Sequence, residues 1–142
     1  MKTSHESITA EEFRGRFLAI CGRGGGQGLP RKQRDQHILF RAAVQGLGRA
    51  SYSESELNNA LEIWLSVVDI GGRIDHVSLR RCLVDAGYLR RDSSGSRYEV
   101  CLAGRAEVLF AANVQDIDAL EVIQTAHVRA AERKRKWARP SA

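Results

Sequence analysis

The sequence predicts a mostly α-helical fold with a small β-hairpin, arranged as a winged-helix-like core flanked by N- and C-terminal helices. Between Asp75 and Val100, a capped helix leads directly into two short strand-forming runs that carry arginines, which is the second half of a winged helix. Several other segments have apolar residues at the spacing of amphipathic helices. We therefore expect three parts: an N-terminal helix with a Gly-rich linker (1–28), a winged-helix-like domain (29–101), and C-terminal helices with a basic tail (102–142).

Composition and cysteine content exclude several classes of protein. Of the 142 residues, 43% are hydrophobic and 27% are charged, which is typical of a globular domain with its own core. No apolar run approaches the roughly 18 residues of a membrane span, and Met1–Ala10 lacks a signal-peptide core, so we expect a cytoplasmic protein. The cysteines form no Cys-x-x-Cys pair and the histidines have no metal-ligand spacing. We therefore expect reduced thiols, no metal and no cofactor.

The N-terminal part is expected to hold one helix over about residues 10–21. Thr9 and Glu12 have the spacing of a capping box. Its apolar stripe consists of Phe13, Phe17, Ile20 and Cys21. The glycine-rich run Gly22–Gly28 follows a helix rather than a strand and has no Gly-Lys-Ser/Thr ending, so it is interpreted as a flexible linker rather than a phosphate-binding loop.

Two more helices are expected before Asp75. The first covers about residues 31–45 and is stopped by Gly46 and Gly48. The second begins at a capping box, Ser53 with Glu56, and has a broad core-facing side. The members of that side are Leu57, Ala60, Leu61, Trp64, Leu65 and Val68. We expect Trp64 to pack in the core against the Leu79–Leu83 side of the next helix.

The stretch from Asp75 to Val100 is predicted in most detail. Asp75 is a suitable N-cap, and Gly87 stands where a helix end requires the left-handed conformation. The apolar stripe of this helix is Leu79, Cys82, Leu83 and Ala86. Two runs, 88–92 and 97–100, then fit the strands of a hairpin joined by Ser-Ser-Gly-Ser.

The C-terminal part is expected to contain a short helix and a long one. Arg105–Ala112 has the pattern of a short helix with Ala106, Leu109 and Phe110 facing inward. Asp116 and Asp118 then begin a long helix that is acidic at its N-terminal end and basic at its C-terminal end, as the helix dipole favours. Its apolar side consists of Leu120, Ile123, Ala126, Ala130 and Trp137.

Four segments of this sequence resemble a bacterial family, the domain of unknown function 2087. They are Leu29-Pro30-Arg31-Lys32, Tyr52–Asn58, Asp75–Gly87 and Arg91–Tyr98. The resemblance covers about residues 29–100, so the first helix and the long C-terminal helix lie outside it. The chain departs from the family at Leu29, where Phe is frequent, and at the turn 69–73, which is longer here. The resemblance implies a small winged-helix-like module, found alone or attached to transcription-regulator domains. It points to no catalytic residues, because none is characterised in the family.

Positive charge is concentrated in two places. The net charge of +5 is carried by residues 129–142, which contain six basic residues and one acid, Glu132. The six are Arg129, Arg133, Lys134, Arg135, Lys136 and Arg139. A second excess lies in His76–Tyr98, where five arginines stand against Asp85 and Asp92. Segregated positive charge indicates a polyanionic partner, although solvated tails have the same composition.

The helix after Asp75 supplies the first candidate contacts with nucleic acid. A step of about 100° per residue places Arg81 opposite the buried stripe and Arg80 on its flank. Val77 and Ser78 border the exposed side, and all four would face the major groove in a helix-turn-helix docking. The alternative interpretation is that Arg81 pairs with Asp85 one turn later and that the helix is simply solvated.

The hairpin and the basic tail supply further candidates. Arg90, Arg91 and Arg97 would contact phosphates as a wing does, or else protect an edge strand from pairing with other chains. In the tail, Arg133, Lys134, Arg135 and Lys136 would neutralise phosphates of DNA or RNA, with Trp137 available for stacking. The alternative for the tail is a solvated helix end.

These observations predict a non-enzymatic nucleic-acid-binding protein, specifically a bacterial DNA-binding transcriptional regulator that uses a helix and a wing. An RNA- or ribosome-associated protein remains open, because a basic tail does not distinguish the two polymers. A protein–protein adaptor, or a homodimer formed through the C-terminal helix, also remains open. We expect no membrane partner.

Overall fold

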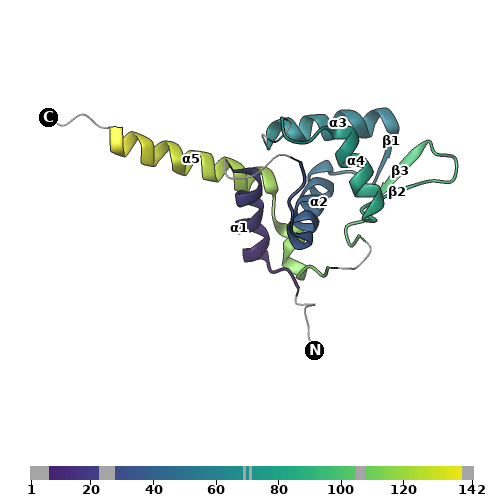
Figure 1. Ribbon diagram of the computed structural model, residues 1–142, viewed down its shortest axis with the longest axis horizontal. Helices are drawn as coiled ribbons and strands as arrows, with labels where there is room; N and C mark the ends of the chain where they lie inside the picture. The colour runs from purple at the N-terminus through teal and green to yellow at the C-terminus, as the bar shows by residue number, and fades with distance from the viewer. Residues whose placement is uncertain (1–6, 23–27, 69, 71, 105–107, 139–142) are drawn as a thin grey trace.

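The computed structural model describes residues 7–22, 28–68, 70, 72–104 and 108–138. The elements in chain order are α1 (Ala10–Cys21), α2 (Gln33–Leu47), β1 (Ser51–Ser53), α3 (Glu54–Val67), α4 (His76–Asp85), β2 (Leu89–Arg91), β3 (Arg97–Val100), the short 3₁₀ helix η1 (Ala112–Asp116) and α5 (Ala119–Ala138). The fold is mostly helical with a small antiparallel sheet, as predicted (Figure 1). Within the described residues, no helix is both long and apolar enough to cross a membrane.

The sheet has one more strand than the sequence predicted. Its order is β1-β3-β2, with all neighbours antiparallel, and Tyr98 of β3 is aligned with Tyr52 on one side and Arg91 on the other. The predicted hairpin is formed by β2 and β3. Strand β1 was missed because three residues are too few to show an alternating pattern, and its pairing partner is more than forty residues away. The order α2-β1-α3-α4-β2-β3 is consistent with a winged-helix-like arrangement.

Short-range hydrogen bonds begin the helices where the sequence predicted. Thr9 Oγ1 accepts from the Glu12 amide at 3.0 Å, and Asp75 Oδ1 accepts from the Ser78 amide at 2.7 Å. Ser53 and Glu56 form both bonds of a capping box. These bonds satisfy amides that a helix leaves unpaired at its first turn.

Helix α2 ends differently from the prediction. It continues through Gly46 to Leu47, and only Gly48, with a φ of 79°, ends it. Gly46 lies against the indole of Trp64 in α3, and a Cβ at this position would collide with the ring. Gly46 therefore allows two helices to approach closely rather than stopping one of them.

Trp64 is buried, as predicted, with only 4% of its surface exposed. Its ring centroid lies 6.2 Å from that of Phe17 in α1. Leu79 and Leu83 are buried in the same hydrophobic core. The core therefore includes α1, which lies outside the winged-helix-like part.

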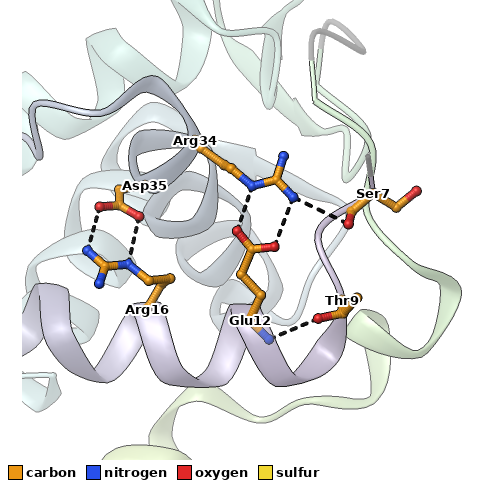
Figure 2. A network of polar contacts seen from close by, with 6 residues as sticks. All are labelled: Ser7, Thr9, Glu12, Arg16, Arg34 and Asp35. Atoms are coloured by element: carbon orange, nitrogen blue, oxygen red, sulfur yellow. Dashed lines mark hydrogen bonds and ion pairs between the residues drawn. The ribbon is translucent and has the colours of Figure 1, made fainter. Parts of the chain in front are cut away.

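Two arginine–carboxylate pairs hold α1 against α2 (Figure 2). Arg16 donates to both oxygens of Asp35, at 3.1 and 2.8 Å. Arg34 donates to both oxygens of Glu12, at 2.5 and 2.8 Å, and also reaches the Ser7 carbonyl oxygen at 3.3 Å. Bidentate pairs of this kind fix direction as well as distance, so they orient α1 on the rest of the fold.

The segment after the sheet is not the helix predicted for Arg105–Ala112. Residues 105–107, and with them Ala106, lie outside the described residues. Val108 lies in a bend, and Leu109–Ala111 pairs in parallel with Ile8. The Ile8 amide donates to the Leu109 carbonyl oxygen at 2.8 Å, and the Ala111 amide donates to the Ile8 carbonyl oxygen at 2.9 Å. Leu109 is 52% exposed instead of facing inward. Backbone pairing with the distant N-terminal segment replaces the local helical pattern here.

Side chains of α2 fix the chain just before α5. The guanidinium of Arg41 donates to the Leu102 carbonyl oxygen at 3.1 Å and lies 4.8 Å from the centroid of the Phe110 ring. Gln45 donates to the carbonyl oxygens of Val114 and Ile117, at 3.3 and 3.1 Å. These contacts therefore attach the N-terminal end of α5 to the core.

Candidate nucleic-acid interface

Helix α4 presents one buried side and one exposed side, as predicted. On its inner side, Leu79 and Leu83 are fully buried. On the opposite side Ser78 and Arg81 are exposed, and Val77 has 40% of its surface exposed. The exposed side therefore combines an aliphatic group, a hydroxyl and a guanidinium, which can contact base edges.

Arg80 is held in place by neighbouring elements. Its guanidinium donates to the side-chain oxygen of Asn58 in α3 and lies 6.0 Å from the centroid of the Tyr98 ring in β3. These contacts connect α4 to both α3 and the sheet. Arg80 is therefore better placed to brace α4 than to reach into a groove, and its own contact with nucleic acid stays a prediction.

The Tyr98 ring joins α4 to the hairpin. Arg91 of β2 lies 5.7 Å from the ring centroid, so arginines from two elements meet at one aromatic ring. The hydroxyl of Tyr98 donates to the carboxylate of Glu54 at 3.3 Å. The Tyr98 ring therefore connects α4 to the hairpin.

Hydrogen bonds to Asp92 order the tip of the hairpin. Its carboxylate accepts from the Ser94 hydroxyl at 2.9 Å and from the amides of Ser96 and Arg97, at 3.1 and 3.2 Å. The bond from Ser94, followed by the backbone amides, lowers the pKa of Asp92. Gly95 has a φ of 76°, which the turn requires. The predicted Ser-Ser-Gly-Ser loop is therefore a defined turn.

The three hairpin arginines do not share one face of the sheet. Arg91 lies on the same face as the buried Tyr98, with which it is aligned. Arg90 is aligned with Glu99 on the other face, and Arg97 donates from Nε to the Ser51 hydroxyl oxygen at 3.1 Å. All three side chains are exposed. Of the three, Arg91 is the one that the ring of Tyr98 places beside α4.

The pair between Arg81 and Asp85, considered as an alternative, is not formed. Among the described residues, no hydrogen bond or ion pair involves the side chain of Arg81. The guanidinium of Arg81 is therefore accessible on the outer side of α4. Asp85 is exposed on the same helix.

The second basic region is far from the first. Arg133, Lys134, Arg135 and Lys136 are all exposed on α5, whereas Arg139 lies outside the described residues. Trp137 beside them has 87% of its surface exposed. Figure 1 shows α5 leaving the body on the side opposite to the hairpin. The structure therefore does not bring the tail together with α4 and the hairpin.

Potential metal ligands and thiols are the other candidate functional groups among the described residues. No group of three or more His, Cys, Asp or Glu side chains within them is placed to hold a metal ion. All three cysteines are free, and burial raises the pKa of Cys21 to about 12. Burial also raises the pKa of Cys82. Neither thiol is activated as a nucleophile would be.

Sequence reasoning missed the residues that support the interface. Asn58 and Glu54 lie on α3, and Tyr98 lies on β3, yet all three help to position α4 or Arg91. Periodicity marks Tyr98 only as an inward-facing strand residue, and Glu54 only as part of a helix start. No local pattern reveals that two arginines converge on one ring.

Comparison with known proteins places the winged-helix-like part in a family. The family model described as "Uncharacterized protein conserved in bacteria (DUF2087)" matches residues 27–100, more than half of the chain. This span runs from the segment before α2 to the end of β3 and leaves out α1 and α5. Neither a curated protein nor a solved structure matches the chain. By this match, the chain belongs to the bacterial DUF2087 family.

Proposed function

We propose that this protein is a non-enzymatic, DNA-binding transcriptional regulator that reads duplex DNA with α4 and contacts phosphates with the β2–β3 hairpin. The observation that carries the proposal is that the accessible Arg81 lies on a helix that its neighbours hold firmly in place. Arg80, on the flank of the same helix, is held by Asn58 and Tyr98. A rigid helix with one accessible guanidinium is suited to directional contacts with bases.

The dimensions and groups of α4 fit the major groove. Its ten residues span about 15 Å, comparable with a groove about 12 Å wide. Arg81 would donate two hydrogen bonds to guanine, and the methyl groups of Val77 would contact the methyl group of thymine. Ser78 remains able to accept a hydrogen bond, because its hydroxyl donates to Asp75 at 3.2 Å.

The arginines of the hairpin would contact the phosphate backbone beside the groove. Arg91 lies near the Tyr98 ring that Arg80 of α4 also approaches, and Arg90 and Arg97 extend positive charge over the other face of the sheet. Contacts with phosphates position a protein but carry little sequence information. The proposal therefore assigns specificity to α4 and orientation to the hairpin.

The basic end of α5 adds affinity without sequence preference in this scheme. Each lysine or arginine that neutralises a phosphate releases counterions, which makes binding depend steeply on salt. The exposed Trp137 beside four cations also supports a second candidate function, in which α5 binds single-stranded RNA by stacking and charge.

The test compares two substitutions on one helix. DNA sites are first selected from random duplexes, and binding is then measured for the wild type, Arg81→Ala and Asp85→Ala at two salt concentrations. Arg81→Ala should cost about 1–3 kcal/mol on the selected site and far less on random DNA. Asp85→Ala removes a negative charge from the same helix, so it should leave binding unchanged or tighten it on every sequence.

A tail variant separates the two candidate functions. Replacing Lys134, Arg135 and Lys136 by Gln should weaken binding to all duplexes alike and flatten the salt dependence. If this variant loses all binding while Arg81→Ala behaves as the wild type, the helix-and-wing proposal is wrong. Binding to single-stranded RNA that exceeds binding to any duplex would then favour the second candidate.

A further inference from the structure

An open groove of about 400 Å³ lies between α1 and α5. Figure 1 shows α5 extending away from the hairpin. The floor of the groove is apolar and includes Leu18 of α1, Ile117, and Val122 and Ala126 of α5. Leu18 and Val122 are only partly buried where they line it. The groove belongs neither to the α4 surface nor to the hairpin.

Charges in this groove are separated along its length. Asp118 and Glu121 line it at the base of α5, whereas Arg129 and Arg133 line it further out. Glu121 and Arg133 are twelve positions apart on one helix, which is about 18 Å along its axis. The two side chains therefore cannot pair within one chain, and the charges that α5 gives to the groove are acidic at its base and basic further out. Arg14 of α1 also lines the groove.

The outer half of α5 packs against no other element of the described structure. Every residue from His127 to Trp137 is exposed. The stripe that is buried at Ile123 and partly buried at Ala126 continues outward through Ala130 to Trp137. A helix of this length without tertiary contacts is marginal in water, so a partner that covers this side would stabilise it.

We propose that the groove holds the outer half of α5 from a second copy of this chain, running antiparallel, so that the protein forms a symmetric homodimer. Antiparallel packing brings Arg133 of the partner subunit to the acidic base of the groove, near Glu121. The indole of Trp137 from the same helix then covers the apolar floor near Ile117. Because the interface is isologous, each of these contacts occurs twice.

The charge of the groove favours a second copy over nucleic acid. The carboxylates of Asp116, Asp118 and Glu121 are balanced by the guanidinium groups of Arg14, Arg129 and Arg133, so the lining has no net positive charge to attract a phosphate chain. The carboxylates at the base of α5 are still free to receive cations from another chain. They attract the cationic end of another α5. In the dimer Arg133 belongs to this contact, whereas Lys134, Arg135 and Lys136 remain available to other partners.

The experiment is sedimentation equilibrium of the full chain, free of nucleic acid, over the micromolar range. The wild type should be a dimer. Glu121→Arg and Arg133→Glu should each raise the dimer dissociation constant about tenfold or more, because each places like charges together. The double variant E121R/R133E reverses both charges and should restore the dimer. Gln124→Arg, exposed on α5 but outside the groove, is the matched control and should not change the dissociation constant.

Trp137→Ala supplies a second, charge-independent measurement and should also weaken the dimer. Circular dichroism melting checks that every variant keeps the fold, as expected for exposed positions. A wild type that stays monomeric throughout the range would overturn the proposal, as would a double variant that is no tighter than the single ones. It is overturned as well if Glu121→Arg leaves the dimer intact but tightens binding to single-stranded RNA, which would assign the groove to nucleic acid.

Discussion

Trp64 of α3 shows how a single residue connects separate helices, because its ring lies 6.2 Å from that of Phe17 in α1 and directly beneath Gly46 of α2. Its indole nitrogen is buried and has no hydrogen-bond partner among the described residues. An unpaired buried donor costs free energy, so the stabilisation from this residue comes from the area and packing of the ring.

Substitutions of Trp64 should separate these two effects. Trp64→Ala should lower the free energy of unfolding by about 3–5 kcal/mol, because it leaves a large cavity among three helices. Trp64→Phe keeps an aromatic ring and removes the unpaired donor, so it should cost much less. Chemical denaturation followed by circular dichroism measures both. Equal losses for the two variants would mean that the indole nitrogen has a partner that contributes to stability.

At the scale of elements, the glycines within helices have different roles. Gly15 of α1 is exposed, and a Cβ there would meet no atom within 4 Å. Gly46 of α2 is also exposed on one side, but a Cβ there would overlap the indole of Trp64. Helix propensity favours alanine over glycine at both positions. Packing against Trp64 opposes alanine only at Gly46.

The same substitution should therefore have opposite effects at the two sites. Gly15→Ala should raise the free energy of unfolding by about 0.5–1 kcal/mol, because alanine restricts the unfolded chain and favours the helix. Gly46→Ala should lower it by about 1–3 kcal/mol despite the better helix propensity, because the ring must move. Thermal melting of both variants beside the wild type measures the contrast. A stabilising Gly46→Ala would show that α2 and α3 can separate without cost.

For the whole molecule, the attachment of α1 to the family core is expected to respond to pH. The hydrogen bond from Arg34 lowers the pKa of Glu12, and burial opposes this with a smaller effect. A carboxyl group whose pKa is lower in the folded state adds stability above its unfolded-state pKa. That stability is lost as the pH falls through the folded-state pKa.

Glu12→Gln should therefore destabilise the protein at neutral pH and make little difference in acid. The expected loss at pH 7 is about 1 kcal/mol, because the pair is bidentate but only partly buried. The gap to the wild type should close as the pH falls below the ordinary pKa of a glutamate and on through the lowered pKa of Glu12, because the wild-type carboxyl then becomes protonated. Denaturation midpoints across this range measure the gap. A gap that does not change with pH would mean that Arg34 does not stabilise the charged form of Glu12.

The sequence alone determined the features that depend on neighbouring residues. The starts of α1, α3 and α4 follow from the caps at Thr9, Ser53 and Asp75, whose hydrogen bonds span three residues. The hairpin follows from two strand-forming runs and a turn, and the exposed side of α4 follows from the helical repeat. The family span of 27–100 agrees with the segments in which these local patterns were strongest.

Only the tertiary structure decided the features that depend on residues far apart in the chain. Strand β1 exists because it pairs with β3, and Leu109–Ala111 is not helical because it pairs with Ile8. The side chain of Arg80 contacts Asn58 and Tyr98, which lie beside it in the folded protein. The side chain of Arg81, on the exposed side of α4, makes no such contact with either residue. The groove beside α5 likewise arises from two helices at opposite ends of the sequence. Periodicity reports which side of an element is buried, but it carries no information on the partner that covers it.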